Sequence, residues 1–300
     1  MQALTQNTEL EIRSDHICGR FAAMASPCEI LIDSINSELG TQIINAAHQE
    51  TQRIEDKFSR YRQHNLMDKI NHSNHQPVAI DDEAFRLLCF ADTCFELSGG
   101  MFDITSGVLR KAWRFDGSDR LPSTALVDSL RSRIGWKQVK FDRKSITLPA
   151  GFELDFGGIG KEYAVDCVAK LAQQIAPTVS VLVNFGGDIQ VTRPRAKQPY
   201  WQVGIENPTD NKSGTAVVNI ANGGLATSGD ANRFLLKDGV RYGHILNPTT
   251  GYPVLDAPRS VTVAGQHCIQ SGLLATLALL QGKDAELFLT KQNVKYWCFR

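Results

Sequence analysis

The chain has 300 residues, of which 42% are hydrophobic and 21% charged, with 32 basic and 32 acidic side chains. This composition is typical of a globular protein that forms one large domain or two ordinary ones. The formal net charge is zero and no apolar run approaches the roughly 20 residues of a transmembrane helix. We therefore expect neither nucleic-acid binding nor membrane insertion.

The cysteines and the N-terminus indicate a cellular compartment. Seven cysteines are scattered along the chain without a CxxC pair, which is typical of reduced and mostly buried thiols. The first 16 residues lack the apolar core and the small-residue cleavage site of a signal peptide. These features predict a cytoplasmic protein.

The first half of the chain is expected to be mainly helical. Residues 1–20 are predicted to be a flexible N-terminal arm ahead of a single domain over residues 21–300, in which a strand at 28–33 comes first. Apolar residues at helical spacing then predict a long helix with the inward residues Ile43, Ile44, Ala47, Thr51, Ile54 and Phe58. A second helix carries Ala84, Leu87, Leu88, Ala91 and Phe95, and it ends at Ser98-Gly99-Gly100. Ser123 is expected to cap a third, short helix.

The second half is richer in β-branched residues. Residues 140–148 are expected to form a hairpin, and further strands are predicted at 179–184, 201–206, 215–220 and 260–264. A late helix carries Leu273, Leu274, Leu277 and Leu280 and ends near Gly282. Because strands and helices do not alternate as regular βαβ units, the pattern favours an α+β fold over a doubly wound sheet.

One segment is especially informative about function. Residues 154–166 read LDFGGIGKEYAVD, an apolar run ending in an acid, then a loop with three glycines that opens directly into a helix. Glycines let a backbone approach a ligand closely, and a helix N-terminus attracts an anion. Asp155 and Lys161 are thus placed to hold a polar, phosphate-bearing ligand. The alternative is a plain strand–turn–helix connection with a solvated lysine.

Other polar groups follow glycine or proline turns. Four Gly-Gly pairs each have an acid nearby, which predicts strand ends converging on a ligand, with ordinary turns as the alternative; the pairs are 99–100, 157–158, 186–187 and 223–224. His244 precedes a proline and glycine loop and is a candidate acid, base or phosphate contact, although it could simply cap a turn.

Six motifs together resemble one family. They are SGGMFDIT (98–105), LDFGGIGKEYAVD (154–166), VNFGGDI (183–189), ATSGD (226–230), HILNPTTGYPV (244–254) and SVTV (260–263). In this order they are similar to the ApbE family of FAD:protein FMN transferases, and the resemblance extends from about residue 21 to about residue 289. It implies a T-fold-like α+β domain with mixed antiparallel sheets and packed helices.

The resemblance also implies a reaction and its partners. Such enzymes bind FAD and Mg²⁺ and transfer FMN to a Ser or Thr hydroxyl of an acceptor protein, with release of AMP. Two alternatives remain open. One is a Mg²⁺-dependent pyrophosphatase that converts FAD to FMN and AMP, and the other is a protein that binds or sequesters FAD without turnover.

The family's functional positions transfer residue by residue. The resemblance implies FAD contacts at Met24, Tyr61, Met101, Phe102, Asp103, Asp155, Lys161 and Leu246. It implies a metal contact from the backbone carbonyl of Gly158 and from the side chain of Thr276. His244 and Asp230 match functional polar positions, and we expect His244 to help activate the acceptor hydroxyl.

One position departs from the family pattern. The family commonly has Ala-Asp-Ala-x-x-Thr in the late helix, with the aspartate on the metal, whereas this chain has Gly272 at the place of the acid. A hard cation such as Mg²⁺ prefers carboxylate oxygen. The metal site at Gly158, Thr276 and position 272 therefore needs another acid, water or the FAD phosphates, and Asp103, Asp155 and Asp230 are candidates.

Overall fold

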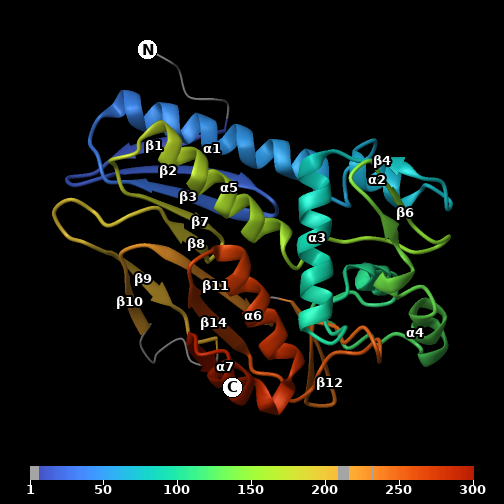
Figure 1. The fold of residues 1–300 in the computed structure, drawn as a ribbon. Helices are drawn as coiled ribbons and strands as arrows, with labels where there is room; N and C mark the ends of the chain where they lie inside the picture. Colours follow the sequence, from blue (N-terminus) through green and yellow to red (C-terminus); the bar gives the residue numbers. More distant parts are fainter. Residues whose placement is uncertain (1–6, 209–215, 231–232) are drawn as a thin grey trace.

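The centre of the protein is an eight-stranded sheet in which every neighbouring pair is antiparallel. The structure is a computed structural model that describes residues 7–208, 216–230 and 233–300. The strands follow the order β1-β2-β3-β7-β8-β11-β14-β15 across the sheet (Figure 1). Their bounds are β1 Glu9–Ile12, β2 Ile17–Ala23, β3 Ser26–Ile32, β7 Val181–Phe185, β8 Asp188–Val191, β11 Gly223–Gly229, β14 Ser260–Gly265 and β15 Lys295–Phe299.

Three long helices cover one face of this sheet. Helix α1 (Ser37–Phe58) packs on β2, α5 (Gly160–Ile175) on β7 and β8, and α6 (Cys268–Leu280) on β11 and β14 (Figure 1). The short η3 (Gly282–Asp284) and α7 (Ala285–Lys291) follow α6. The inward residues expected for α1 are all buried, which confirms the helical spacing. Among the described residues, none of the helices has the length and apolarity required to cross a bilayer.

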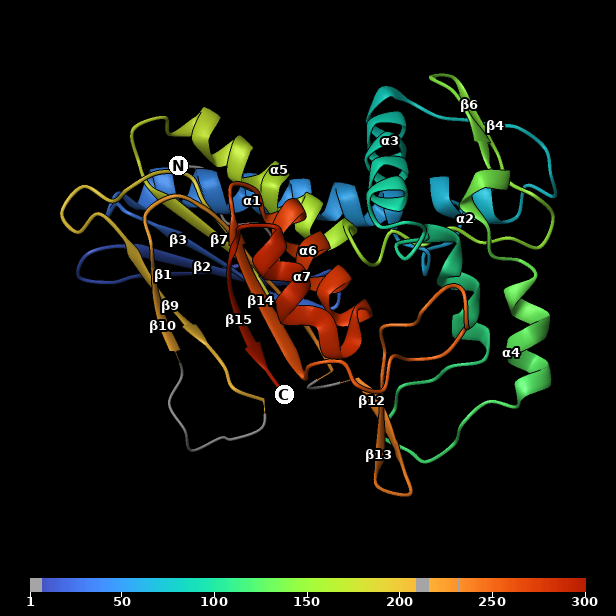
Figure 2. The same ribbon diagram turned by 60° about the horizontal axis from the view of Figure 1, so that its bottom comes forward.

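A two-stranded hairpin covers part of the other face. It consists of β9 (Trp201–Ile205) and β10 (Ala216–Ile220) and lies on the side of the sheet away from α1 and α5 (Figure 2). Side chains alternate along a strand. Val183 of β7 accordingly belongs to the core under the helices, whereas the adjacent Leu182 packs with the hairpin. Residue 215, at the start of the strand expected at 215–220, lies outside the described residues.

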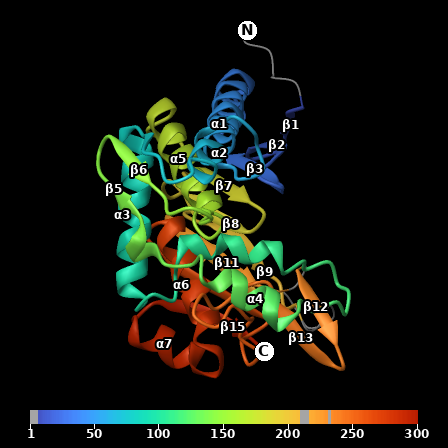
Figure 3. The ribbon, with the colours of Figure 1, turned by 90° about the vertical axis from the view of Figure 1, so that its right-hand side faces the viewer.

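The remaining elements gather beyond one end of the sheet (Figure 3). Helix α3 (Asp82–Leu97) stands beside a small sheet of order β4-β6-β5, and the expected hairpin at 140–148 forms two of its strands. Ser123 caps α4 as expected, since its Oγ accepts the N–H of Leu126 at 3.3 Å. The other bounds are α2 Leu66–Asn71, β4 Val78–Ala79, η1 Ile104–Lys111, α4 Thr124–Arg131, η2 Trp136–Gln138, β5 Lys140–Phe141, β6 Ser145–Thr147, β12 Phe234–Lys237 and β13 Val240–Gly243.

The N-terminal segment differs from its prediction as a flexible arm over residues 1–20. From Glu9 to Ile12 the chain forms the edge strand β1, paired with Ile17–Arg20 of β2. Its sequence, ELEI, alternates polar and apolar residues, but the run has only four residues and most of it is exposed, so it is a weak strand signal. Backbone hydrogen bonds to β2, rather than side-chain burial, hold this segment in the sheet.

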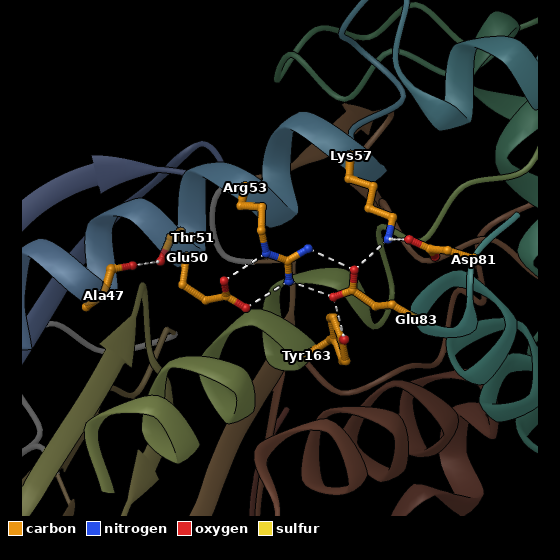
Figure 4. Close-up of polar contacts among 8 residues, drawn as sticks. All are labelled: Ala47, Glu50, Thr51, Arg53, Lys57, Asp81, Glu83 and Tyr163. Carbon is orange, nitrogen blue, oxygen red and sulfur yellow. Dashed lines mark hydrogen bonds and ion pairs between the residues drawn. The ribbon is translucent and has the colours of Figure 1, made fainter. Parts of the chain in front are cut away.

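A polar network joins α1, α3 and the start of α5 (Figure 4). Glu83 of α3 accepts hydrogen bonds from Arg53 at 2.7 Å, from Lys57 at 2.6 Å and from the Tyr163 hydroxyl at 2.9 Å. Arg53 above all, with Lys57 and Tyr163, lowers the pKa of Glu83 to about 2. Arg53 also pairs with Glu50 on its own helix. The network fixes the first turn of α5 against the neighbouring helices.

Candidate functional site

The first turn of α5 is the natural starting point of the site. Chain residues Phe156–Ile159 turn directly into the helix, and no side chain caps its N-terminus. Lys161 Nζ lies 2.9 Å from Oδ2 of Asp188, whose Oδ1 accepts the backbone N–H of Thr227 at 3.2 Å. Burial disfavours the charge on Lys161, yet its pKa is raised because Asp188 more than compensates. The structure therefore holds a protonated lysine at an uncapped helix N-terminus.

Two tight turns lie beside this lysine. Gly186 and Gly187, with φ of 59° and 97°, make the turn between β7 and β8, a conformation that favours glycine. A Cβ added at Gly186 would lie 3.0 Å from Cβ of Ser26 and 3.7 Å from Nζ of Lys161. Met24 lies in the adjacent β2–β3 turn with φ of 52°, and its N–H donates to Glu55. Met24 and Lys161 are thus brought to the same end of the sheet.

Asp155 is held by two arginines. Its Oδ2 lies 3.2 Å from both Arg60 Nη1 and Arg110 Nε, and its Oδ1 accepts the N–H of Gly157 at 2.8 Å. Arg110 also donates to the hydroxyl of Tyr61 at 2.6 Å, although the Tyr61 side chain is largely exposed. Sequence reasoning missed both arginines because neither stands in a recognised motif. A possible signal was the position of Arg60 directly before Tyr61.

The segment at residues 99–103, which reads Gly-Gly-Met-Phe-Asp, packs on the glycine loop. A Cβ added at Gly158 would lie 3.0 Å from the ring of Phe102. Asp103 caps η1: its Oδ1 accepts from the N–H and the hydroxyl of Thr105, and its Oδ2 accepts from the N–H of Trp136. Asp103 thus joins two loops and has little capacity left for a ligand. Met101, next to Phe102, is half-buried against the main core.

A cavity of about 780 Å³ lies next to this segment. Its volume is in the range of small-molecule sites. Two predicted motifs meet there, at Gly99, Gly100 and Asp103 on one side and at Pro248 and Thr249 on the other. Lys161 and His244 are not among its lining residues. The charged cluster around Lys161 therefore lies outside the lining of this cavity.

His244 and Asp230 occupy different environments. The Nδ1 atom of His244 is buried and has no hydrogen-bond partner among the described residues. Burial, followed by the charges of Arg233 and Arg110, lowers its pKa to about 4, so the ring is neutral at pH 7. Asp230 instead accepts hydrogen bonds from Arg241 and Arg259, each at 2.7 Å. Leu246, two residues after His244, is half-buried and bridges to Pro253.

The face of α6 that meets α5 carries the hydroxyl of Thr276 and, at Gly272, no side chain. Thr276 Oγ1 and Ser228 Oγ of β11 are 2.8 Å apart. Gly272 lies one turn before Thr276, and a Cβ added there would lie 2.8 Å from both Cγ and Oε1 of Glu162. The Glu162 side chain, on the first turn of α5, therefore fills the space in front of Gly272. Sequence reasoning included Glu162 in the glycine-loop motif but assigned it no function, because its contact with Gly272 joins residues far apart in the chain.

The predicted convergence of the Gly-Gly pairs is only partial. Gly157 lies near Arg110, and Gly186 lies near Lys161. The pair at 223–224 lies at the opposite end of β11 from Ser228, where a Cβ at Gly224 would be 2.4 Å from the backbone nitrogen of Cys268. Gly224 is therefore a close-packing residue under the start of α6.

The fold and the site together define a class of protein: an α+β protein that brings a glycine loop, a lysine and two arginines together near the start of α5. The ApbE family model matches residues 24–298. The FAD:protein FMN transferase of Vibrio cholerae is 27% identical over 249 residues, covering 81% of this chain and 74% of its own length. The protein of the same name from Treponema pallidum is 31% identical over 235 residues, covering 72% of this chain and 64% of its own.

Solved structures agree with this relationship. The ApbE protein from Thermotoga maritima superposes with a TM-score of 0.85 at 30% identity, over 94% of both chains. The flavin transferase ApbE from Vibrio cholerae superposes with a TM-score of 0.81 at 24% identity, over 97% of this chain and 94% of its own. The chain belongs to the ApbE family. The predictions of the family, of the α+β fold and of a transferase as the enzyme class are confirmed.

Proposed function

We propose that this protein is an FAD:protein FMN transferase that moves FMN from FAD to a Ser or Thr hydroxyl of an acceptor protein. The single observation that supports this most is the protonated Lys161 at the uncapped N-terminus of α5, beside the Gly186-Gly187 turn. A lysine and free backbone N–H groups at a helix N-terminus are suited to a pyrophosphate, the group across which FMN and AMP separate.

In the proposed reaction, one bond to phosphorus forms as another breaks. The acceptor hydroxyl oxygen forms a bond to the phosphorus of the FMN half, the bond from this phosphorus to the bridging oxygen breaks, and AMP leaves with that oxygen. Negative charge accumulates on the pyrophosphate oxygens during this exchange. Lys161 is expected to neutralise part of it, and Met24, Tyr61 and Asp155 are proposed to position FAD.

His244 is proposed to take the proton of the acceptor hydroxyl. Its ring is neutral at pH 7 because burial lowers its pKa to about 4, and its Nδ1 has no hydrogen-bond partner among the described residues. A general base must be unprotonated before it can accept a proton. Asp230, with both carboxylate oxygens on arginines, is better placed to order these loops than to exchange a proton.

Mg²⁺ is proposed as the cofactor. The oxygen atoms at the α5–α6 contact are the donor type that a hard cation prefers, and they include one buried carboxylate oxygen that lacks a hydrogen-bond partner. The side chain of Thr276 and the backbone carbonyl of Gly158 are proposed to hold the ion. When bound, Mg²⁺ would neutralise charge on the pyrophosphate.

An acceptor assay tests the proposal. The full chain is incubated with FAD, with and without Mg²⁺, beside a protein that carries the Asp-Gly-x-Ser/Thr-Gly-Ala-Thr segment typical of acceptors for this family. The expected result is Mg²⁺-dependent flavin fluorescence on the denatured acceptor together with AMP release. Release of AMP without labelling would identify a pyrophosphatase, and bound FAD without AMP would identify a binding protein.

A matched pair of variants localises the activity. Lys161→Met is expected to abolish labelling and to weaken FAD binding, because it removes the cation at the start of α5. Lys170→Met changes an exposed lysine farther along the same helix and is expected to have no effect. Equal activity in the two variants would contradict the placement of the pyrophosphate at Lys161.

A further inference from the structure

Glu162 is a buried acidic residue on the first turn of α5. The residue is only 7% exposed, and its Oε2 has no hydrogen-bond partner among the described residues. Burial of an unpaired carboxylate is costly, so such groups are usually paired, neutralised or bound to a cation. The adjacent Lys161 does not serve as the partner, because its ammonium group pairs with Asp188 at 2.9 Å.

The surroundings of Glu162 are oxygen-rich. Its carboxylate lies against Gly272, and Thr276 is one turn further along α6 on the same face. Thr276 in turn contacts the hydroxyl of Ser228 at 2.8 Å. No cluster of three or more His, Cys, Asp or Glu side chains suited to a metal occurs in the described ranges, so a cation here would rely on one carboxylate with hydroxyl, carbonyl, water or phosphate oxygens.

The two helices are locked in this arrangement. Asp166 lies one turn after Glu162 on α5, and its carboxylate accepts the backbone N–H groups of Cys268 at 3.0 Å and Ile269 at 3.1 Å. This cap fixes the N-terminus of α6 on α5. The Glu83 network holds the neighbouring Tyr163 from the other side (Figure 4). The backbone that carries Glu162 is therefore fixed relative to α6, and its side chain lies in front of Gly272.

A side chain at position 272 would clash with Glu162 in its present conformation. A Cβ at position 272 would approach Cγ and Oε1 of Glu162 to 2.8 Å and Cδ to 3.0 Å, closer than real Cβ contacts. An aspartate at 272 and the present Glu162 conformation cannot coexist. A carboxylate reaches this space from α5 because α6 contributes no side chain there.

We propose that Glu162 supplies the carboxylate ligand of the divalent cation, in the place of an acid at position 272. The ion would lie between the first turn of α5 and the Thr276 face of α6. This inference deepens the proposed function and rests on it for the identity of the ion. It also gives Gly272 a function, which is to leave room for the glutamate.

Cation binding tests the proposal independently of turnover. Mn²⁺ is titrated into the full-length protein, without FAD and again with bound FAD, and the free ion is followed by electron paramagnetic resonance. Glu162→Gln keeps the size of the side chain and is expected to weaken Mn²⁺ binding by at least about tenfold. Removal of a residue that only hydrogen-bonds to a metal ligand already costs about that much, so loss of a direct ligand should cost no less. Glu38→Gln changes an exposed acid in the first turn of α1, and it is expected to bind Mn²⁺ as the unchanged protein does.

A second pair of variants relocates the ligand. Glu162→Ala is expected to lose Mn²⁺ binding, and adding Gly272→Asp to it is expected to restore binding, because the shortened side chain at 162 leaves room for an aspartate. Circular dichroism and the thermal midpoint identify any variant that has not folded. Mn²⁺ binding by a folded Glu162→Gln or Glu162→Ala protein as tight as that of the unchanged chain would overturn the proposal, as would absence of Mn²⁺ binding by the unchanged chain.

The outcome is separable from that of the acceptor assay. Loss of Mn²⁺ binding in Glu162→Gln supports the ligand even if the unchanged protein labels no acceptor, in which case only the transfer function fails. Mg²⁺-dependent labelling that persists undiminished in Glu162→Gln, with unchanged Mn²⁺ affinity, would retain the transferase and reject Glu162 as its ligand.

Discussion

Replacing His244 by glutamine should remove a defined part of the pH dependence of stability. Burial and the charges of Arg233 and Arg110 lower the pKa of His244 from 6.5 to about 4 in the folded protein. The unfolded chain therefore binds a proton first as the pH falls, and the folded state loses stability between about pH 6.5 and pH 4. The full loss is about 3 kcal/mol, of which about 2 kcal/mol falls between pH 7 and pH 5.

Urea unfolding at pH 7 and pH 5 measures this effect. The decrease in the free energy of unfolding should be smaller by about 2 kcal/mol in His244→Gln than in the unchanged protein, since all other titrating groups contribute to both. His75→Gln, which changes an exposed loop histidine, is the matched control. Equal pH dependence in His244→Gln and the unchanged protein would refute the buried, neutral histidine. An NMR titration of the His244 ring provides the same pKa directly.

Three further substitutions test other contacts. Lys161→Met leaves the buried Asp188 without its ion-pair partner, so we expect the protein to lose about 3 kcal/mol of stability and to bind FAD more weakly. An unchanged thermal midpoint would contradict a stabilising ion pair between Lys161 and Asp188. Asp103→Ala removes the cap of η1 and the acceptor for the Trp136 N–H, which should lower the free energy of unfolding in urea by about 1–3 kcal/mol. A smaller decrease than that of Glu38→Ala, which changes an exposed acid, would reject this structural function. Glu83→Gln weakens the contacts of Arg53, Lys57 and Tyr163. Because Arg53 is half exposed, we expect the free energy of unfolding to fall by only about 1 kcal/mol. The midpoint of urea unfolding measures this loss, and an unchanged midpoint would contradict it.

Local periodicity predicted most of the secondary structure. The helices with one buried face, α1 and α3, follow directly from apolar residues at helical spacing. The strand at 28–33 and the hairpin at 140–148 appear within one or two residues of their expected positions. Edge strand β1 escaped prediction because its alternating run, ELEI, has only four residues, and pairing with β2 rather than burial stabilises it.

The candidate site was less accessible from the sequence. The glycine loop and Lys161 were evident because a helix start, glycines and a lysine are adjacent in the chain. Arg60 and Arg110 were not, since each reaches the loop from a different element, and the pairing of Asp188 with Lys161 also appears only in the structure. Spacing along the chain carries no information about which distant side chain becomes the partner of an acid.

The sequence by itself determined the family, through six motifs in a fixed order, and it determined that position 272 lacks an acid. Only the tertiary structure decided which carboxylates have capacity for a cation. Asp103, Asp155 and Asp230 are each occupied by backbone N–H groups or arginines. Glu162 alone among these four has a buried oxygen without a partner in the described part of the chain. The packing of α5 on α6 places this glutamate opposite a glycine, and the neighbouring lysine pairs with Asp188 instead.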